Sequence, residues 1–167
     1  MLKIMGLNPP NILSRSLSAP WMLGVYTGAD GRSSTFSIAT TDFFQNSFAG
    51  MLQWEPTMAD DLKQLLYPAQ VSGIANIPTN QSPIVQASGV GTTSPTTTAP
   101  EVKPYFTLRG AFRDRIIQNR DVREFVTVDG DILFLYSFVD NSHLVVAGSE
   151  AALSEIVTRL EKQTFLR

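Results

Sequence analysis

The spacing of apolar residues in the first part of the chain predicts a short helix followed by a β-hairpin. Asn8 is placed to cap the short helix, with Pro9 at its first helical position. The runs 21–27 and 35–40 are rich in apolar and β-branched residues, and the sequence GADG at 28–31 lies between them. Glycine and aspartate are typical of turns, so the two runs are expected to pair as strands.

Helical spacing of apolar residues then predicts a long helix. Thr41 or Asp42 is expected to cap it, and Pro56 is expected to kink or restart it. Its apolar residues recur at intervals of three and four, as a face toward a core requires. Those residues are Phe44, Phe48, Met51 and Leu52 before the proline, and Met58, Leu62, Leu65 and Leu66 after it.

The last third of the chain predicts a short helix, three strands and a final helix. The short helix is expected at 111–119 and the strands at 122–128, 132–139 and 143–147. An Asp-Gly turn precedes the second strand, which is apolar on both faces and is therefore expected at the centre of a sheet. Ser149 is placed to cap the final helix. The core-facing residues of that helix are Leu153, Ile156, Val157 and Leu160.

Residues 35–52 can be laid on residues 143–160 without a gap. In both segments an apolar strand leads into a hydroxyl residue, an acidic residue and an amphipathic helix. Either the chain contains a ββα pseudo-repeat, or any strand-turn-helix unit produces this pattern. Together the elements predict an α+β fold: a two-layer sandwich in which an antiparallel sheet of about five strands has two main helices on one face.

A long uncharged segment divides the chain. No charged residue occurs between Tyr67 and Pro100, and the segment 68–104 holds six of the ten prolines. Such a Pro, Thr and Gly-rich stretch buries too little apolar area to offset the entropy of ordering it. We therefore expect a single α+β domain over 1–167, built from 1–67 and 105–167, with 68–104 as a linker or long loop.

The composition of the chain limits the cellular locations and the partners that can be expected for it. Charged residues form 17% of the chain, against roughly 25% in ordinary soluble proteins, which favours an extracytoplasmic location. A net charge of -2 predicts no nucleic acid partner. The apolar start is interrupted by Asn8-Pro9-Pro10, so this segment is expected to be soluble and not to insert into a membrane, and any anchor would lie upstream.

Few residues are suited to catalysis or metal binding. The chain has no cysteine and one histidine, His143, so thiolate chemistry and Cys-ligated zinc are excluded. The carboxylate pairs Asp60-Asp61 and Asp129/Asp131 lack calcium-loop spacing and are interpreted as structural. We therefore predict no catalytic residue, no metal ligand and no cofactor.

The arginine-rich stretch 109–123 carries the densest charge in the chain and is the candidate interaction surface. Mixed charges of this kind usually form ion pairs on a solvated face, and the alternatives are an anionic ligand or an acidic patch of a partner. A second candidate lies on the long helix, where core packing is the competing interpretation. The candidate residues are Arg109, Arg113, Arg115, Arg120 and Arg123, together with Trp54 and Met58.

Three runs carry a resemblance to a group of proteins. They are FAGMLQWEPTMADDL at 48–62, the stretch from FRD at 112–114 to NRDVR at 119–123, and LYSFVD at 135–140. They resemble segments of uncharacterised, membrane-anchored envelope proteins of candidate-phyla bacteria. That resemblance brings no activity and no site residues. It implies the soluble part of an envelope protein.

The favoured functional hypothesis is a non-enzymatic interaction or structural module, with a protein partner or self-association. The alternative is a small-ligand or anion-binding sensor domain, whose pocket would carry convergent polar groups. A third hypothesis is an enzyme of unknown type that uses Asp, Glu, Arg, Tyr or Ser.

Overall fold

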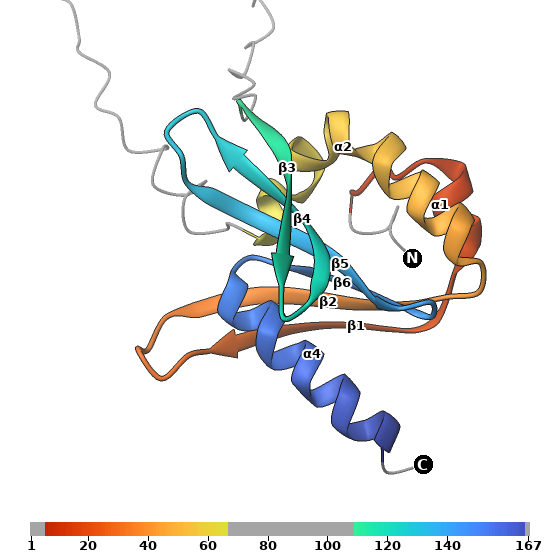
Figure 1. The fold of residues 1–167 in the computed structure, drawn as a ribbon. Coiled ribbons are helices and arrows are strands. Elements are labelled where there is room, and N and C mark those ends of the chain that lie inside the picture. Colours follow the sequence, from red (N-terminus) through yellow and green to blue (C-terminus); the bar gives the residue numbers. More distant parts are fainter. Residues whose placement is uncertain (1–5, 67–108, 166–167) are drawn as a thin grey trace, which may run out of the picture.

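The computed structural model describes residues 6–66 and 109–165, which form an α+β structure built on one antiparallel sheet of six strands (Figure 1). The sheet order is β1-β2-β6-β5-β4-β3. With the labels of Figure 1, the strands are β1 (Leu17–Thr27), β2 (Ser33–Thr41), β3 (Gly110–Ile117), β4 (Arg120–Thr127), β5 (Ile132–Asp140) and β6 (His143–Ala147). The helices are α1 (Asn11–Ser16), α2 (Phe44–Leu66) and α4 (Glu150–Phe165). The class and the antiparallel sheet are confirmed, with six strands rather than about five.

The two described segments share this sheet. β2 from the first segment pairs antiparallel with β6 from the second, with Ile38 opposite Val145. β5 and β6 lie at the centre, and the seven positions from Leu133 to Val139 in β5 are buried except Phe138. The predicted central position of β5 is confirmed. The predicted linker 68–104 lies outside the described residues.

The placement of the two main helices differs from the prediction, because α2 and α4 pack on opposite faces of the sheet (Figure 1). Tyr136 and Val146 face each other across β5 and β6 and join the core under α2. Leu135 and Ala147, one residue along, join the core under α4. Neighbouring residues of a strand point to opposite faces, so strands that are apolar throughout need a cover on both sides.

The predicted ββα units exist as two hairpins followed by helices, β1-β2-α2 and β5-β6-α4. Their arrangement is not that of a two-fold repeat. Ile38 and Val146 are counterparts in the ungapped alignment, yet Ile38 packs on the α4 side and Val146 on the α2 side. A two-fold axis normal to the sheet would keep them on one face. The sequence similarity therefore reflects the shared strand-turn-helix pattern.

The predicted short helix at 111–119 is wrong, because these residues form strand β3 and the turn into β4. Gln118 and Asn119 both have positive φ angles, 50° and 59°, which is typical of a two-residue hairpin turn. The strand holds Phe112 against Phe125, with ring centroids 5.3 Å apart. Pairing with β4 outweighs the helical spacing of the apolar residues, which tertiary context often overrides.

The start of α4 agrees with the prediction and the starts of α1 and α2 do not. The Ser149 hydroxyl accepts a hydrogen bond from the Ala152 amide at 3.2 Å and caps α4. Asn8 caps nothing, since α1 begins after Pro10 without a side-chain cap. Thr41 instead donates its hydroxyl to the Asn141 carbonyl at 3.0 Å, and α2 runs through Pro56 as one helix.

Helix α1 packs tightly on α2 through small residues. A Cβ atom on Gly50 would lie 2.7 Å from the Leu13 Cβ and 2.9 Å from the Leu13 backbone. Beside this contact, the buried Ser47 hydroxyl donates to the Ser16 hydroxyl at 2.8 Å, and Ser16 donates to the Leu13 carbonyl at 3.0 Å. The two helices therefore form one unit, and the N-terminal half of α2 is fixed in place by it.

Candidate functional site

Helix α2 carries two apolar stripes, and only one of them faces the core. Met51, Trp54, Met58 and Leu62 are buried against the sheet. A second stripe, at spacing i, i+4, i+8, consists of Phe44, Phe48 and Leu52, which are 36%, 42% and 40% exposed. A helix needs only one apolar stripe to pack on a sheet. The second stripe is only partly covered, and its exposed part is a candidate binding surface.

The exposed stripe meets a third aromatic ring from the sheet. Phe138 of β5 lies edge-on to Phe44 with ring centroids 5.1 Å apart, and 6.0 Å from the ring of Phe48. Next to these rings a groove of about 540 Å³ opens between α2 and the ends of β3 and β4. We call it the aromatic groove. Its lining includes Phe48, Ile116 and Phe138, with Asp114, Asp121 and Arg123 among its polar residues.

An ion-pair network stands beside the groove and ties α2 to the sheet. Glu55 of α2 accepts two hydrogen bonds from Arg123 of β4, at 2.8 Å from Nε and 2.6 Å from Nη2. The Tyr136 hydroxyl of β5 donates to the same carboxylate at 2.8 Å. The remaining Arg123 nitrogen, Nη1, donates to Asp114 at 2.8 Å, and its guanidinium lies 5.7 Å from the centre of the Phe112 ring. All three guanidinium nitrogens therefore already have a carboxylate partner.

Burial and charge shift the titration of this network. Desolvation raises the pKa of Tyr136 far above its ordinary value of 10.0, and the hydrogen bond to Glu55 raises it further, because ionising Tyr136 would place two negative charges together. The pKa of Arg123 is also raised, chiefly by its hydrogen bond to Glu55. Near neutral pH, Arg123 is therefore a guanidinium cation and Tyr136 a neutral phenol.

The predicted arginine cluster is divided between the two faces of the sheet. Arg123 points to the α2 side, whereas Arg115 and Arg120 reach α4 on the other side. Arg115 pairs with Glu150 at 3.0 Å and with Glu124 at 3.3 Å, and Arg120 pairs with Glu161 at 2.6 Å. Arg109 and Arg113 are exposed. The five arginines therefore do not form one patch, because alternate residues of a strand face opposite ways.

Trp54 and Met58 are wrong as candidate surface residues. They are 5% and 0% exposed, and both belong to the core under α2. The Trp54 indole donates to Asp61 at 2.6 Å, which satisfies its polar group at the edge of that core. Core packing, the competing interpretation of these two residues, is the correct one. The exposed apolar residues of α2 lie a few positions earlier.

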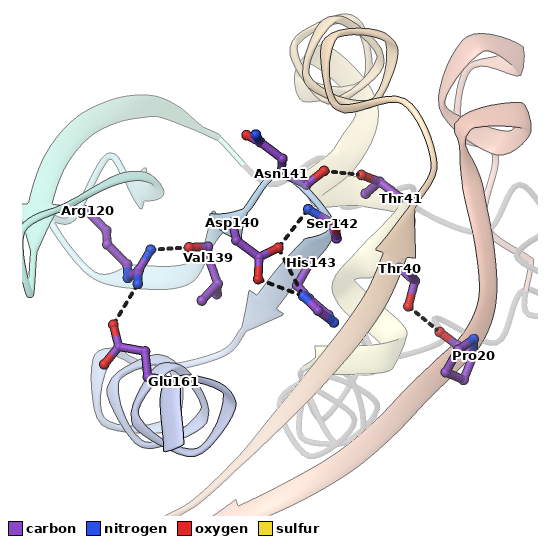
Figure 2. A network of polar contacts seen from close by, with 10 residues as sticks. All are labelled: Pro20, Thr40, Thr41, Arg120, Val139, Asp140, Asn141, Ser142, His143 and Glu161. Carbon is purple, nitrogen blue, oxygen red and sulfur yellow. Dashed lines mark hydrogen bonds and ion pairs between the residues drawn. The ribbon is translucent and has the colours of Figure 1, made fainter. Parts of the chain in front are cut away.

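The single histidine, His143, is the first residue of β6, directly after the turn that joins β5 to β6 (Figure 2). Its Nδ1 atom is 2.9 Å and 3.0 Å from the two carboxylate oxygens of Asp140, and the Ser142 amide donates to Asp140 at 2.6 Å. Burial alone would raise the pKa of Asp140, but these hydrogen bonds outweigh it and hold that pKa below its ordinary value. Asp140, Ser142 and His143 thus organise a tight turn, and the serine contributes its amide rather than a nucleophilic hydroxyl.

Figure 2 also shows how the same end of the sheet is fastened to its neighbours. The Arg120 guanidinium donates to the Val139 carbonyl and to Glu161 of α4. On the other side, the Thr40 hydroxyl donates to the Pro20 carbonyl of β1 at 3.2 Å. Within 6–66 and 109–165, no group of three or more acidic or histidine side chains is placed to hold a metal ion.

Several residues of the candidate site were not singled out by sequence. Phe44 and Phe48 were expected in the core, and neither Glu55 nor Tyr136 was assigned a role. The available signal was the width of the apolar surface of α2, since two stripes are more than one packing face requires. The Glu55–Arg123 contact joins residues 68 positions apart, and nothing in the local sequence indicates it.

The chain matches no protein-family model, no curated protein sequence and no solved structure. Among the helices that the structure describes, none has the length and hydropathy needed to cross a bilayer.

Proposed function

We propose that this protein is a non-enzymatic interaction module that binds a segment of a partner protein in the aromatic groove. The observation that carries the proposal is the exposed stripe of Phe44, Phe48 and Leu52 beside that groove. Large apolar side chains gathered on a monomer surface mark binding sites, and aromatic residues are enriched at the centre of interfaces. A rigid helix fixed by α1 and by the Glu55–Arg123 pair presents them.

The charges around the groove indicate the chemistry of the partner segment. Asp121 is exposed, and within the described ranges its carboxylate forms no ion pair. Asp114 is 85% exposed and has one oxygen bonded to Arg123. Arg115 and Arg123 also line the groove, but both are paired with carboxylates, which leaves Asp121 as the charge available to a ligand. Such a groove suits a segment that combines an aromatic or aliphatic anchor with lysine or arginine.

An anionic ligand is disfavoured at the same place. Such a ligand would have to displace Glu55 or Asp114 from Arg123, whose three nitrogens are all engaged. Arg115 and Arg120 are likewise held by carboxylates of β4 and α4. The arginines of this chain therefore serve mainly to fasten its elements together.

A peptide-display selection tests this proposal. The full chain is used as bait, and the recovered peptides are measured for affinity to the wild type, to Phe48→Ser and to Val128→Ser. Val128 is a matched control, because it is an apolar residue, 75% exposed, in the turn after β4. We expect peptides with an apolar anchor and a basic residue, and a loss of affinity of about tenfold or more for Phe48→Ser only. Equal binding to all three chains would refute the proposed site.

We also propose the cell envelope as the location of this module. The support is the low charge content, 17% of the residues, and the uncharged stretch between Tyr67 and Pro100. Fractionation of cells that express the natural full-length gene product tests it. Recovery in the membrane or periplasmic fraction is expected, and recovery in the cytosol alone would contradict it.

A further inference from the structure

The two edges of the sheet differ in how they are protected. β3 forms one edge and carries Arg113, Asp114 and Arg115 in succession. β1 forms the other edge and has no charged residue along its 11 positions, LSAPWMLGVYT. Charged side chains are a common way to prevent a sheet edge from pairing with another strand. β3 has this protection and β1 does not.

The hydrogen bonds of the β1–β2 hairpin show which backbone groups of β1 face outward. The Gly28 amide donates to the Arg32 carbonyl at 2.9 Å, next to the pair Thr27 and Ser33. Backbone groups alternate along an antiparallel strand, so even-numbered residues of this stretch bond to β2. The odd-numbered residues Trp21, Leu23, Val25 and Thr27 direct their N–H and C=O groups to the open edge. Among the described residues, no strand pairs with them.

Apolar side chains flank this open edge on both faces of the sheet. Met22 is 55% exposed on the α4 face, and Leu23 and Val25 are 42% and 66% exposed on the other. A groove of about 410 Å³ lies next to the strand, lined by Met22, Tyr26, Phe36, Ile156 and other residues. The edge thus offers both backbone hydrogen-bonding groups and apolar contact area.

We propose that β1 pairs antiparallel with β1 of a second copy of this chain, about a two-fold axis at Gly24. Gly24 is the midpoint of 21–27, the regular part of the strand after its bulge, so this register pairs the whole stretch. It places Leu23 opposite Val25 of the second copy, and Met22 opposite Tyr26. The outward odd-numbered residues then bond to one another.

The absence of charge on β1 favours a second copy over a different partner. In a two-fold interface the strand meets its own copy, so a charge near the axis would lie close to the same charge of the second copy, across the axis. A neutral, apolar strand is free of that repulsion. The pairing is independent of the proposed function, because the aromatic groove lies at the β3 side of the sheet and stays open.

Sedimentation velocity on the full chain and two edge variants tests the pairing. The wild type is expected at twice the chain mass of 18.3 kDa. Val25→Lys and Leu23→Glu should each sediment as monomers, because each puts charge at the interface. A Val128→Lys control, 75% exposed and distant from β1, should remain a dimer. Both edge positions are exposed enough to accept a charge, and circular dichroism checks that each variant is folded.

Mixing the two edge variants tests the register. In a mixed dimer, Lys at position 25 of one chain faces Glu at position 23 of the other, so an equimolar mixture should recover the dimer mass. A monomeric wild type, or a dimer that survives Val25→Lys, would overturn the proposal. A folded mixture that stays monomeric would overturn pairing about Gly24. A dimeric wild type that dissociates on Val25→Lys, together with equal peptide affinity for the wild type and Phe48→Ser, would count against the proposed function alone.

Discussion

Glu55 joins α2 to two strands of the sheet. Its side chain is 13% exposed, and it accepts hydrogen bonds from Arg123 and Tyr136, both on the sheet. Removing one partner of a largely buried ion pair costs more than the pair contributes, because the remaining charge stays desolvated. The same carboxylate accepts the hydrogen bond of the Tyr136 hydroxyl, and the Tyr136 side chain is almost fully buried.

Replacing Glu55 by glutamine should lower the free energy of unfolding. Arg123 is 24% exposed, so solvent softens the penalty, and we expect a loss of about 1–3 kcal/mol. Urea denaturation at neutral pH measures it. Asp114→Asn is the matched control, since Asp114 is 85% exposed and pairs with the same guanidinium; its effect should stay within about 1 kcal/mol. Equal losses for the two variants would show that burial of Glu55 is not the decisive factor.

Tyr136 should stay protonated for as long as the protein stays folded. Its pKa is raised by desolvation and by Glu55, so the folded state holds this proton more tightly than the unfolded state does. The tighter binding of this proton stabilises the folded state. This stabilisation is fully present below the ordinary pKa of 10.0 and is lost as pH rises above it.

The measurement is a spectrophotometric titration of tyrosine ionisation in the wild type and in Tyr136→Phe. The two folded proteins should show the same absorbance change near pH 10, because Tyr136 does not ionise before unfolding. A smaller change in Tyr136→Phe would mean that Tyr136 titrates as an ordinary, solvated phenol. Urea-unfolded samples supply the control, in which the variant must show the smaller change.

At the scale of elements, the contact between α1 and α2 fixes the exposed aromatic stripe. Gly50 lets the Leu13 backbone approach the helix, and the buried hydroxyl pair of Ser16 and Ser47 lies beside it. An exposed helical glycine usually gives a more stable protein when replaced by alanine, by up to about 1 kcal/mol. Here the added methyl would meet backbone atoms, which cannot move aside as a flexible side chain can.

Gly50→Ala should therefore destabilise the protein rather than stabilise it, by about 1–3 kcal/mol from overpacking. Thermal unfolding followed by circular dichroism gives the sign of this change in stability. Asn46→Ala, at an exposed position of the same helix, is the control and should be neutral or slightly stabilising. A stabilised Gly50→Ala variant would show that α1 is not packed on α2 in this way.

Local signals accounted for most of the elements but not for their mutual arrangement. The turns at Gly28–Gly31 and Asp129–Gly130, the cap at Ser149 and the central strand β5 all follow from residues close in sequence. β3 was predicted as a helix because Phe112, Ile116 and Ile117 have helical spacing. Its strand form depends on β4, and pairing between strands is a property of two segments rather than one.

At the scale of the whole molecule, the decisive feature is that the sheet is covered on both faces. The apolar pattern of β5 indicates two buried faces, which is inconsistent with the predicted placement of both helices on one face. Because α2 and α4 cover opposite faces of the sheet, the arginines of β3 and β4 are divided between these two faces. This arrangement also leaves part of the apolar surface of α2 exposed. The candidate site arises from that exposed part, which no single motif in the sequence records.

The position of the peptide contact is the most direct test of the proposed interaction module. Amide chemical shifts of the isotope-labelled full chain are followed while a peptide recovered by selection is added. We expect shifts concentrated in 44–52 and 114–123, on the two sides of the aromatic groove, with little change along 21–27. Shifts confined to 21–27, or to the β5–β6 turn at Asn141 and Ser142, would contradict it.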